Sequence, residues 1–355
     1  MELQQHHTRK RGEKMFKLLD FFRVHKSLAI DLGTANILIY DKQKKKIVLN
    51  EPSVVAKDKK TGKVIAVGSE AREMLGKTPD SIVAIKPLKD GVIADIDSTR
   101  QMIDHFLKKI YGNSLFKPEI MMCMPLEITS VERKALFDSV TGAKRIYIIE
   151  EGRAAIIGSG VDISRPEGNM VVDIGGGSTD IAILSLDEVI SSKSIKVAGN
   201  KFDDDIVKYV RNNYNLLIGD RTAEKIKKEL ATALPVEEEE IMNVKGRNLE
   251  NGIPKIVQIN SNQVLEAIHD SLYEIITSTK EVLEKCPPEL AADILDNGII
   301  ITGGGSLIKN FATLLEKEVR IKVILSEEPL NSVVLGGGKA FDSKNLLRTL
   351  QVREY

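Results

Sequence analysis

The chain has 355 residues, of which 51 are basic, 51 are acidic and 42% are hydrophobic. This length exceeds the usual ceiling for a single core, so we expect two domains, and balanced charge offers no global field that would attract nucleic acid as a partner. Two widely separated cysteines and five histidines without metal-ligand spacing predict reduced thiols in a cytoplasmic protein and no structural zinc.

The N-terminal region divides into a polar tail and an amphipathic segment. Residues 1–14 are polar and basic, which predicts a disordered tail. In residues 15–26 polar side chains recur at every third position, so a helix here would have one polar stripe and a broad apolar face. Such a helix can lie in a membrane interface or pack on the protein's own core, and its position before the first strand favours the membrane. The predicted membrane anchors on its apolar face are Phe16, Leu19 and Phe22.

Three glycine turns each follow a short apolar strand. The turns lie at residues 31–34, 173–179 and 300–306, after predicted strands at 27–30, 170–172 and 298–301, and the third opens a predicted helix from Leu307. Glycine lets backbone N–H groups approach phosphate oxygens closely, and a strand-end carboxylate can hold a divalent cation through water. A single turn of this kind is usually a hairpin or a capped turn. Three of them favour phosphate binding, with a nucleotide held between two similar halves.

These turns and several longer stretches resemble the MreB family of bacterial actins, within the superfamily of actin, Hsp70 and sugar-kinase ATPases. The stretches are residues 30–36, 49–55, 89–95 and 287–290, and the resemblance runs from about Leu28 to Asp342. It implies an α/β, actin-like ATPase fold with two similar domains, each a central mixed sheet flanked by helices. The implied boundaries are 27–165 with 335–355 for domain I and 166–334 for domain II, with small subdomains at about 53–85 and 202–265.

The same resemblance implies ATP and Mg²⁺ as cofactors and gives roles to individual residues. Asp31 and Asp173 would hold Mg²⁺ through water, while Glu151 would orient the attacking water and Ser178 would supply a hydroxyl where the family usually has Thr. The residues that would contact the nucleotide are Thr34, Ala35, Asn36, Gly176, Gly177, Ser178, Glu224, Lys225, Ile226, Lys227, Gly303, Gly304, Gly305 and Ser306. Without the resemblance, the helix around Glu224 reads as a solvated charged face. A preference for ATP over GTP cannot be read from these residues.

The chain departs from the family pattern beside the catalytic position. The family usually has Pro and then Met where this chain has Gly152 and Arg153, and it usually has Glu where this chain has Asp180. Proline would fix the start of the helix, whereas glycine loosens it, and Arg153 adds a charge beside the carboxylate. We predict a slow ATPase. The departures at Gly152 and Arg153 affect its rate of hydrolysis.

The resemblance implies a cytoskeletal protein that polymerises into membrane-associated filaments and sets cell shape. Its implied partners are further copies of the chain, the inner face of the cytoplasmic membrane and membrane morphogenesis proteins. Leu115 and Phe116 stand in a loop, where an apolar pair usually turns inward; the resemblance makes them secondary membrane anchors. Charge runs at 42–46, on a predicted hairpin turn, and 237–240, on a predicted inter-strand loop, are either solvated or contacts to a neighbouring subunit.

Two other members of the superfamily are alternatives. A small-molecule kinase would share the nucleotide cleft but would form ADP only with an acceptor present. An Hsp70-like chaperone would need a substrate domain after the ATPase core, and none is expected after residues 336–340. The kinase is therefore the alternative that we retain.

Overall fold

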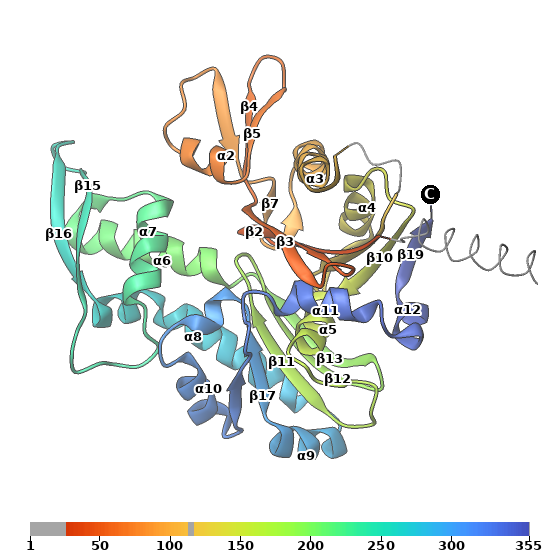
Figure 1. Cartoon of the computed structure of the whole chain (residues 1–355). Coiled ribbons are helices and arrows are strands. Elements are labelled where there is room, and N and C mark those ends of the chain that lie inside the picture. The colour runs from red at the N-terminus through yellow and green to blue at the C-terminus, as the bar shows by residue number, and fades with distance from the viewer. Residues whose placement is uncertain (1–25, 113–116, 355) are drawn as a thin grey trace, which may run out of the picture.

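The structure is a computed structural model that describes residues 26–112 and 117–354. Two large β-sheets, one in each half of the molecule, form its centre (Figure 1). We call the six-stranded sheet with its helices the first lobe and the five-stranded sheet with its helices the second lobe. The predicted membrane anchors lie outside the described residues; these are Phe16, Leu19, Phe22, Leu115 and Phe116.

The sheet of the first lobe has the strand order β19-β10-β9-β1-β2-β3. Its strands are β1 Ser27–Leu32, β2 Asn36–Asp41, β3 Lys46–Pro52, β9 Glu119–Met124, β10 Arg145–Glu150 and β19 Gln351–Glu354. β1 pairs antiparallel with β2 and parallel with β9, which is in turn parallel to β10. Because successive side chains of a strand point to opposite faces, Ile30 packs toward α3 (Ile96–Tyr111) and α4 (Ser130–Ser139) and Ala29 toward α5 (Glu151–Gly158) and α11 (Ser332–Ala340). Helices therefore cover both faces of this sheet.

The sheet of the second lobe has the order β13-β12-β11-β17-β18. Its strands are β11 Asn169–Ile174, β12 Thr179–Ser185, β13 Glu188–Ile195, β17 Ile299–Thr302 and β18 Val323–Leu325. Val172 packs in one cluster with residues of α6 (Gly199–Tyr214), α8 (Ser261–Glu284) and α10 (Phe311–Val319). Its neighbour Val171 packs instead in the cluster that contains α5 and α11. These two helices thus lie between the sheets and belong to the core of both lobes.

α5 and α11 approach each other at backbone distance. A Cβ built on Gly158 would lie 1.8 Å from the carbonyl oxygen of Ser332, and one built on Gly336 would lie 1.7 Å from that of Ala154. Only glycine fits at these two positions, because any side chain would overlap the facing helix. The chain crosses between the lobes through these helices, so they are the natural axis for movement of one lobe against the other.

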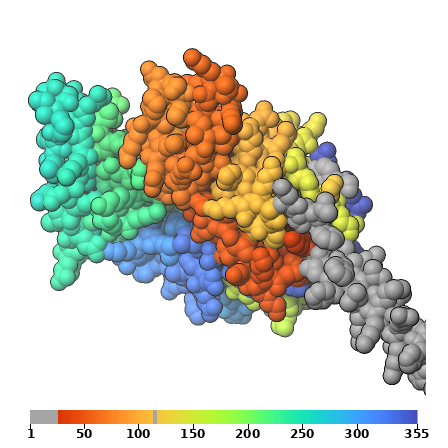
Figure 2. All heavy atoms as spheres, turned by 45° about the horizontal axis from the view of Figure 1, so that its top comes forward, coloured from red at the N-terminus to blue at the C-terminus, as the bar shows by residue number. Residues whose placement is uncertain are grey.

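Each lobe carries a smaller projection. On the first lobe it contains β4 Val55–Asp58, β5 Val64–Val67, β6 Ile82–Ile85 and α2 Ser69–Met74, followed by the hairpin of β7 Leu88–Lys89 and β8 Val92–Ile93. On the second it contains β14 Leu216–Leu217, β15 Ile241–Asn248, β16 Pro254–Asn260 and α7 Asp220–Leu230. Figure 2 shows the two as neighbouring projections, orange and cyan. The remaining elements are α9 Pro288–Asn297, η1 Gly304–Leu307 and α12 Lys344–Thr349.

Two local expectations need correction. The helix expected from Leu307 begins at Phe311 instead, because Ile308 is extended and Asn310 takes a left-handed backbone with φ of 62°. The acidic run 237–240 lies between a helix, α7, and β15 rather than between two strands. Lys42, Lys44 and Lys45 lie in the turn between β2 and β3, as expected for a hairpin, and Lys46 is the first residue of β3.

Two further observations concern the membrane and the thiols. Within the described ranges, no helix combines the length and apolarity needed to cross a membrane. Cys123 is buried and Cys286 is partly buried, and both are free thiols.

Candidate functional site

A cavity of about 910 Å³ opens between the lobes, and all three glycine turns line it. Its volume is within the range of sites that hold a nucleotide-sized ligand. α2 of the first small projection and α7 of the second line its outer end. The cavity therefore has a floor made of turns and an entrance between the two projections.

The first turn is held by hydrogen bonds from two neighbouring segments. The Ser53 hydroxyl donates to the carbonyl oxygen of Gly33 (2.6 Å), and the amide of Gly91 donates to Oγ1 of Thr34 (2.9 Å). Gly91 comes from the tight β7–β8 hairpin and has φ of +81°, a conformation that side chains rarely adopt. The turn is thus fixed in place from its own lobe.

The second turn is tied to the start of α6. The amides of Gly199 and Asn200 donate to the carbonyl oxygens of Gly175 (3.1 Å) and Gly176 (2.8 Å). The turn also meets the first turn across the cleft: a Cβ on Gly177 would lie 2.4 Å from Oγ1 of Thr34. The sequence places these two turns 142 positions apart, counted from Asp31 to Asp173, and the fold brings them into contact.

Four carboxyl groups gather at the cleft floor: Asp31, Glu151 and Asp173 line the cavity, and Asp180 is buried beside them. Burial raises the pKa of Asp31 to about 7 and that of Asp180 to about 6. The pKa of Glu151 is raised well above its usual range by burial and by the neighbouring charges of Asp180, Asp31 and Asp173. The pKa of Asp173 is raised for the same reasons. Buried carboxylates that repel one another are an environment in which a bound cation is strongly favoured.

The donor set of the floor fits a hydrated divalent cation. Asp31 and Asp173 come from the two facing strands β1 and β11, and both line the cavity. Across the described ranges, no three His, Cys, Asp or Glu side chains lie close enough together to hold a metal directly. A cation placed here would therefore complete its shell with water and phosphate oxygens, as Mg²⁺ prefers.

An ion pair between the projections spans the outer end of the cavity. Nη2 of Arg72, on α2, donates to Oε2 of Glu224, on α7. Lys228 donates to the other oxygen of Glu224 at 2.7 Å. Lys227 donates to the carbonyl oxygen of Gly199 at 2.7 Å and so ties α7 to the start of α6. A nucleoside that uses Glu224 would compete with Arg72 for its carboxylate.

The structure brings most of the residues predicted from the sequence to this one cavity. Those that line it are Asp31, Thr34, Ala35, Asn36, Glu151, Asp173, Gly176, Gly177, Ser178, Glu224, Lys227, Gly303, Gly304 and Gly305. Three others do not: Ile226 is fully buried in the core, Lys225 faces solvent, and Ser306 is buried with its hydroxyl donating to the carbonyl oxygen of Gly303. Their predicted contact with a nucleotide stays a prediction.

Sequence reasoning missed a set of charged residues that also line the cavity. They are Arg72, Lys77, Lys86, Asp203, Asp220, Arg221, Lys228 and Lys309. None of them belongs to a glycine turn, and an isolated charged side chain in a polar helix or loop looks like any solvated side chain. The sequence did signal Pro52, Val54 and Gly91, which lie within the stretches 49–55 and 89–95 and also line the cavity.

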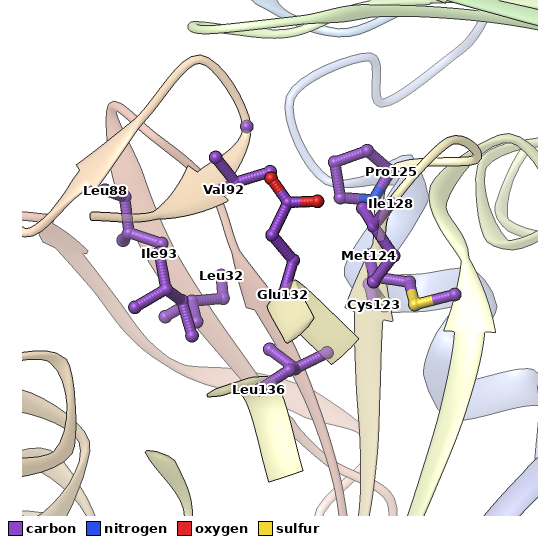
Figure 3. A pocket seen from close by; sticks show the side chains of 11 residues that line it. Leu32, Leu88, Val92, Ile93, Cys123, Met124, Pro125, Ile128, Glu132 and Leu136 are labelled. Carbon is purple, nitrogen blue, oxygen red and sulfur yellow. The ribbon is translucent and has the colours of Figure 1, made fainter. Parts of the chain in front are cut away.

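A second, much smaller hollow lies inside the first lobe (Figure 3). Its volume is about 20 Å³, and its lining is mainly apolar, with Leu32, Val92 and Leu136 among the contributors. The carboxylate of Glu132 reaches its edge but accepts hydrogen bonds from the amide and hydroxyl of Thr129. The hollow holds little more than one water molecule, so we assign it no ligand.

Comparison with known proteins decides the family. The model for the family described as MreB/Mbl protein matches residues 25–349. The chain belongs to the MreB/Mbl family. It is 50% identical to the cell shape-determining protein Mbl of Bacillus subtilis (strain 168), over 91% of this chain and 97% of that protein. It is 48% identical to the cell shape-determining protein MreB of Escherichia coli (strain K12), over 89% of this chain and 93% of that protein.

A solved structure of an MreB protein has the same fold. The crystal structure of MreB 5 of Spiroplasma citri bound to AMPPNP superposes with a TM-score of 0.85 and 37% identity. The match covers 92% of this chain and 98% of that one. The predicted actin-like α/β fold is thereby confirmed. The kinase alternative has no support among these MreB/Mbl relatives.

Proposed function

We propose that this MreB/Mbl chain is a cytoskeletal protein that binds ATP with Mg²⁺, hydrolyses it slowly and polymerises into membrane-associated filaments. The observation that carries the proposal is the contact of two facing phosphate turns, where Gly177 meets Thr34, at the floor of a cleft between two lobes. The AMPPNP bound to the similar MreB 5 supports ATP as the nucleotide. The names of the curated relatives support a role in cell shape. In walled rods that role would be guidance of wall synthesis, and in wall-less cells it would be shape and motility.

The residues of the cleft divide the proposed work between them. Backbone amides of the two turns would hold the β- and γ-phosphates, and the hydroxyl of Ser178 lies at the second turn. Asp31 and Asp173 would hold Mg²⁺ through water, and the ion would neutralise charge on the phosphates. Glu151 would accept a hydrogen bond from the attacking water and orient it. We also propose that the moving units are residues 27–165 with 335–355 and residues 166–334.

Sedimentation and phosphate release of the purified full chain test this proposal together. The parent is expected to pellet with ATP and Mg²⁺ but not without nucleotide. Glu151→Ala should still pellet, while its phosphate release falls by about a hundredfold, the usual effect of losing a general base. Glu70→Ala, which removes an exposed carboxylate of α2, is the control and should match the parent. Phosphate release that is unchanged in Glu151→Ala would show that another group orients the water, and ADP formed only with an acceptor would restore the kinase.

The membrane part of the proposal depends on residues 15–26. Their sequence pattern predicts a helix whose apolar arc would insert below the head groups of an anionic bilayer, with basic side chains at the surface. Flotation with anionic liposomes should recover the full chain and should lose a variant that begins at Ser27. Leu19→Glu should also lose binding, whereas Asp20→Asn on the polar stripe should not. Equal flotation of the full and shortened chains would contradict the assignment.

A further inference from the structure

The side chain of Arg153, two residues after Glu151, is buried. Only 5% of the side chain is exposed. The residue follows Glu151 by two positions on α5, so it points to a different side of the helix. Glu151 lines the cleft, and Arg153 does not. Any action of Arg153 on the site therefore passes through the helix that carries Glu151.

The guanidinium of Arg153 lies among groups from both lobes. Its Nε is 3.2 Å from Oε2 of Glu150, at the end of β10. Its Nη1 donates to Oγ1 of Thr349 on α12 at 3.4 Å, and these two partners belong to the first lobe. Its Nη2 donates to Oε2 of Glu188, the first residue of β13 in the second lobe, at 3.5 Å. A buried cation needs such partners, because an unpaired charge in this position is costly.

Gly152, between Glu151 and Arg153, is also enclosed by both lobes. A Cβ on Gly152 would lie 3.2 Å from Leu126 of the first lobe and 3.2 Å from Ala182 of the second. The amide of Leu126 donates across the same interface to Oδ1 of Asp180, at 2.9 Å. The first turn of α5 thus contacts both lobes twice. Gly152 makes the contacts on one side of the helix, and Arg153 makes them on the other.

We propose that Arg153 is a positioning residue for Glu151, which fixes the first turn of α5 against both lobes through its guanidinium. The inference rests on the proposed ATPase function and deepens it, since it names a residue that controls the rate. Separation of the lobes at β13 would break the contact between Arg153 and Glu188. The buried cation therefore favours the arrangement with the lobes together, in which Glu151 faces the cleft floor. The absence of a side chain at Gly152 allows the close approach of the lobes that this arrangement needs.

Three variants of the full chain test the role of Arg153 in catalysis. Arg153→Met removes the cation and keeps most of the volume, and Arg153→Lys keeps the cation without the planar fork. Arg165→Met is the matched control, because Arg165 also pairs with an acid three residues away but is 65% exposed. Single-turnover phosphate release is measured at saturating ATP, and the Kd of a fluorescent ATP analogue is measured separately.

We expect Arg153→Met to slow phosphate release by about tenfold, while the Kd of the ATP analogue changes by less than about twofold. This is the result expected when a substitution weakens stabilisation of the transition state and leaves nucleotide binding intact. Arg153→Lys should recover part of the rate, and Arg165→Met should match the parent. Glu188→Gln should also slow phosphate release. It should add little to the effect of Arg153→Met, since both variants remove the same contact between Arg153 and Glu188. Release at the parent rate in Arg153→Met, or equal slowing in Arg165→Met, would overturn the inference.

A distance measurement separates this inference from the proposed function. Spin labels at Thr61→Cys and Asn251→Cys, in a Cys286→Ser background, report the separation of the two small projections; both positions are exposed, and Cys123 is buried. Arg153→Met should broaden the distance distribution of the nucleotide-bound chain, and Arg165→Met should not. If the parent releases no phosphate, hydrolysis is excluded, but the distance distribution still decides whether Arg153 fixes the lobes. An unchanged distance distribution in folded Arg153→Met would overturn the inference. If Arg153→Met does not fold, the same measurement is made on Glu188→Gln, and an unchanged distribution there would overturn the inference.

Discussion

At the scale of single residues, paired charges hold the first small projection to the body of its lobe. The ammonium of Lys57, on β4, lies 2.7 Å from Oδ2 of Asp95 and donates to the hydroxyl of Ser98. Asp95 is also the N-cap of α3, since its Oδ1 accepts from the amide of Ser98 at 3.0 Å. One carboxylate therefore starts a helix and anchors a strand that lies 38 positions earlier.

Asp95→Ala should destabilise the protein by about 1–2 kcal/mol, because it removes both the cap and the partner of Lys57. The measurement is urea unfolding at pH 7. Asp97→Ala, on the exposed first turn of the same helix, is the control and should change the unfolding free energy by less than about 0.5 kcal/mol. An Asp95→Ala variant as stable as the parent would show that the pair contributes nothing.

The contribution of Asp95 should also depend on pH. Partial burial alone would raise its pKa, but the hydrogen bonds and charge of Lys57 and Ser98 outweigh burial and lower the pKa to about 2. A lowered pKa in the folded state stabilises the protein above the ordinary value of 3.8 and ceases to do so as pH falls toward 2. The stability difference between parent and Asp95→Ala should therefore shrink between about pH 4 and pH 2. A difference that stays constant over this window would contradict the assigned pKa.

At the scale of secondary structure, the contact of α5 with α11 determines how the lobes can move. Ala154, Gly158 and Gly336 bring the two backbones so close that no side chain separates them. Small residues at a helix crossing allow rotation about the contact while they keep the helices together. The two helices also share one apolar cluster with both sheets, so any movement of the lobes repacks that cluster.

Gly336→Ala should lower the free energy of unfolding by about 3 kcal/mol, because its Cβ would overlap the carbonyl oxygen of Ala154. Gly219→Ala is the control: nothing lies within 4 Å of its added Cβ, and its φ of −94° suits any residue. Chemical denaturation of both variants measures the difference. Equal stability would mean that the helices separate without cost and that the contact does not define the axis.

Much of the site could be predicted from local sequence, and the reason is physical. Asp31 and Asp173 each follow an apolar run and precede glycines, so strand, turn and carboxylate are specified within a few residues. The helix start beside Gly152 is expected from the resemblance, and α5 begins at Glu151. By contrast, the pair of Arg72 with Glu224 joins residues 152 positions apart and depends on how the lobes are set relative to each other. Neither residue carries a local signal of that contact.

The partners of Arg153 show the same limit. Its position two residues after Glu151 predicts a charge beside that carboxylate. The structure instead places the guanidinium between β13 and α12, because the helix turns it away from the cleft. Helical periodicity predicts the direction of the side chain, but only the tertiary fold shows which elements lie on that side.

At the scale of the whole molecule, nucleotide should stabilise the protein by joining the two lobes. A ligand that binds only the folded state at a hundred times its Kd adds about 2.7 kcal/mol to the free energy of unfolding. ATP with Mg²⁺ should therefore raise the Tm of the parent. Gly177→Ala should abolish most of this shift, because its Cβ would overlap Thr34 at the junction of the two turns. Glu70→Ala, at an exposed position outside the cavity lining, should retain it, and a full shift in Gly177→Ala would place the nucleotide elsewhere.

The central claim is that nucleotide held between the lobes drives assembly into membrane-bound filaments. Electron microscopy of the full chain with ATP and Mg²⁺ on an anionic lipid monolayer tests it most directly. We predict filaments on the lipid for the parent, with nucleotide density between the two phosphate turns, and none for Gly177→Ala. Parent protein that binds ATP and stays folded but forms no filaments on the monolayer would contradict the claim.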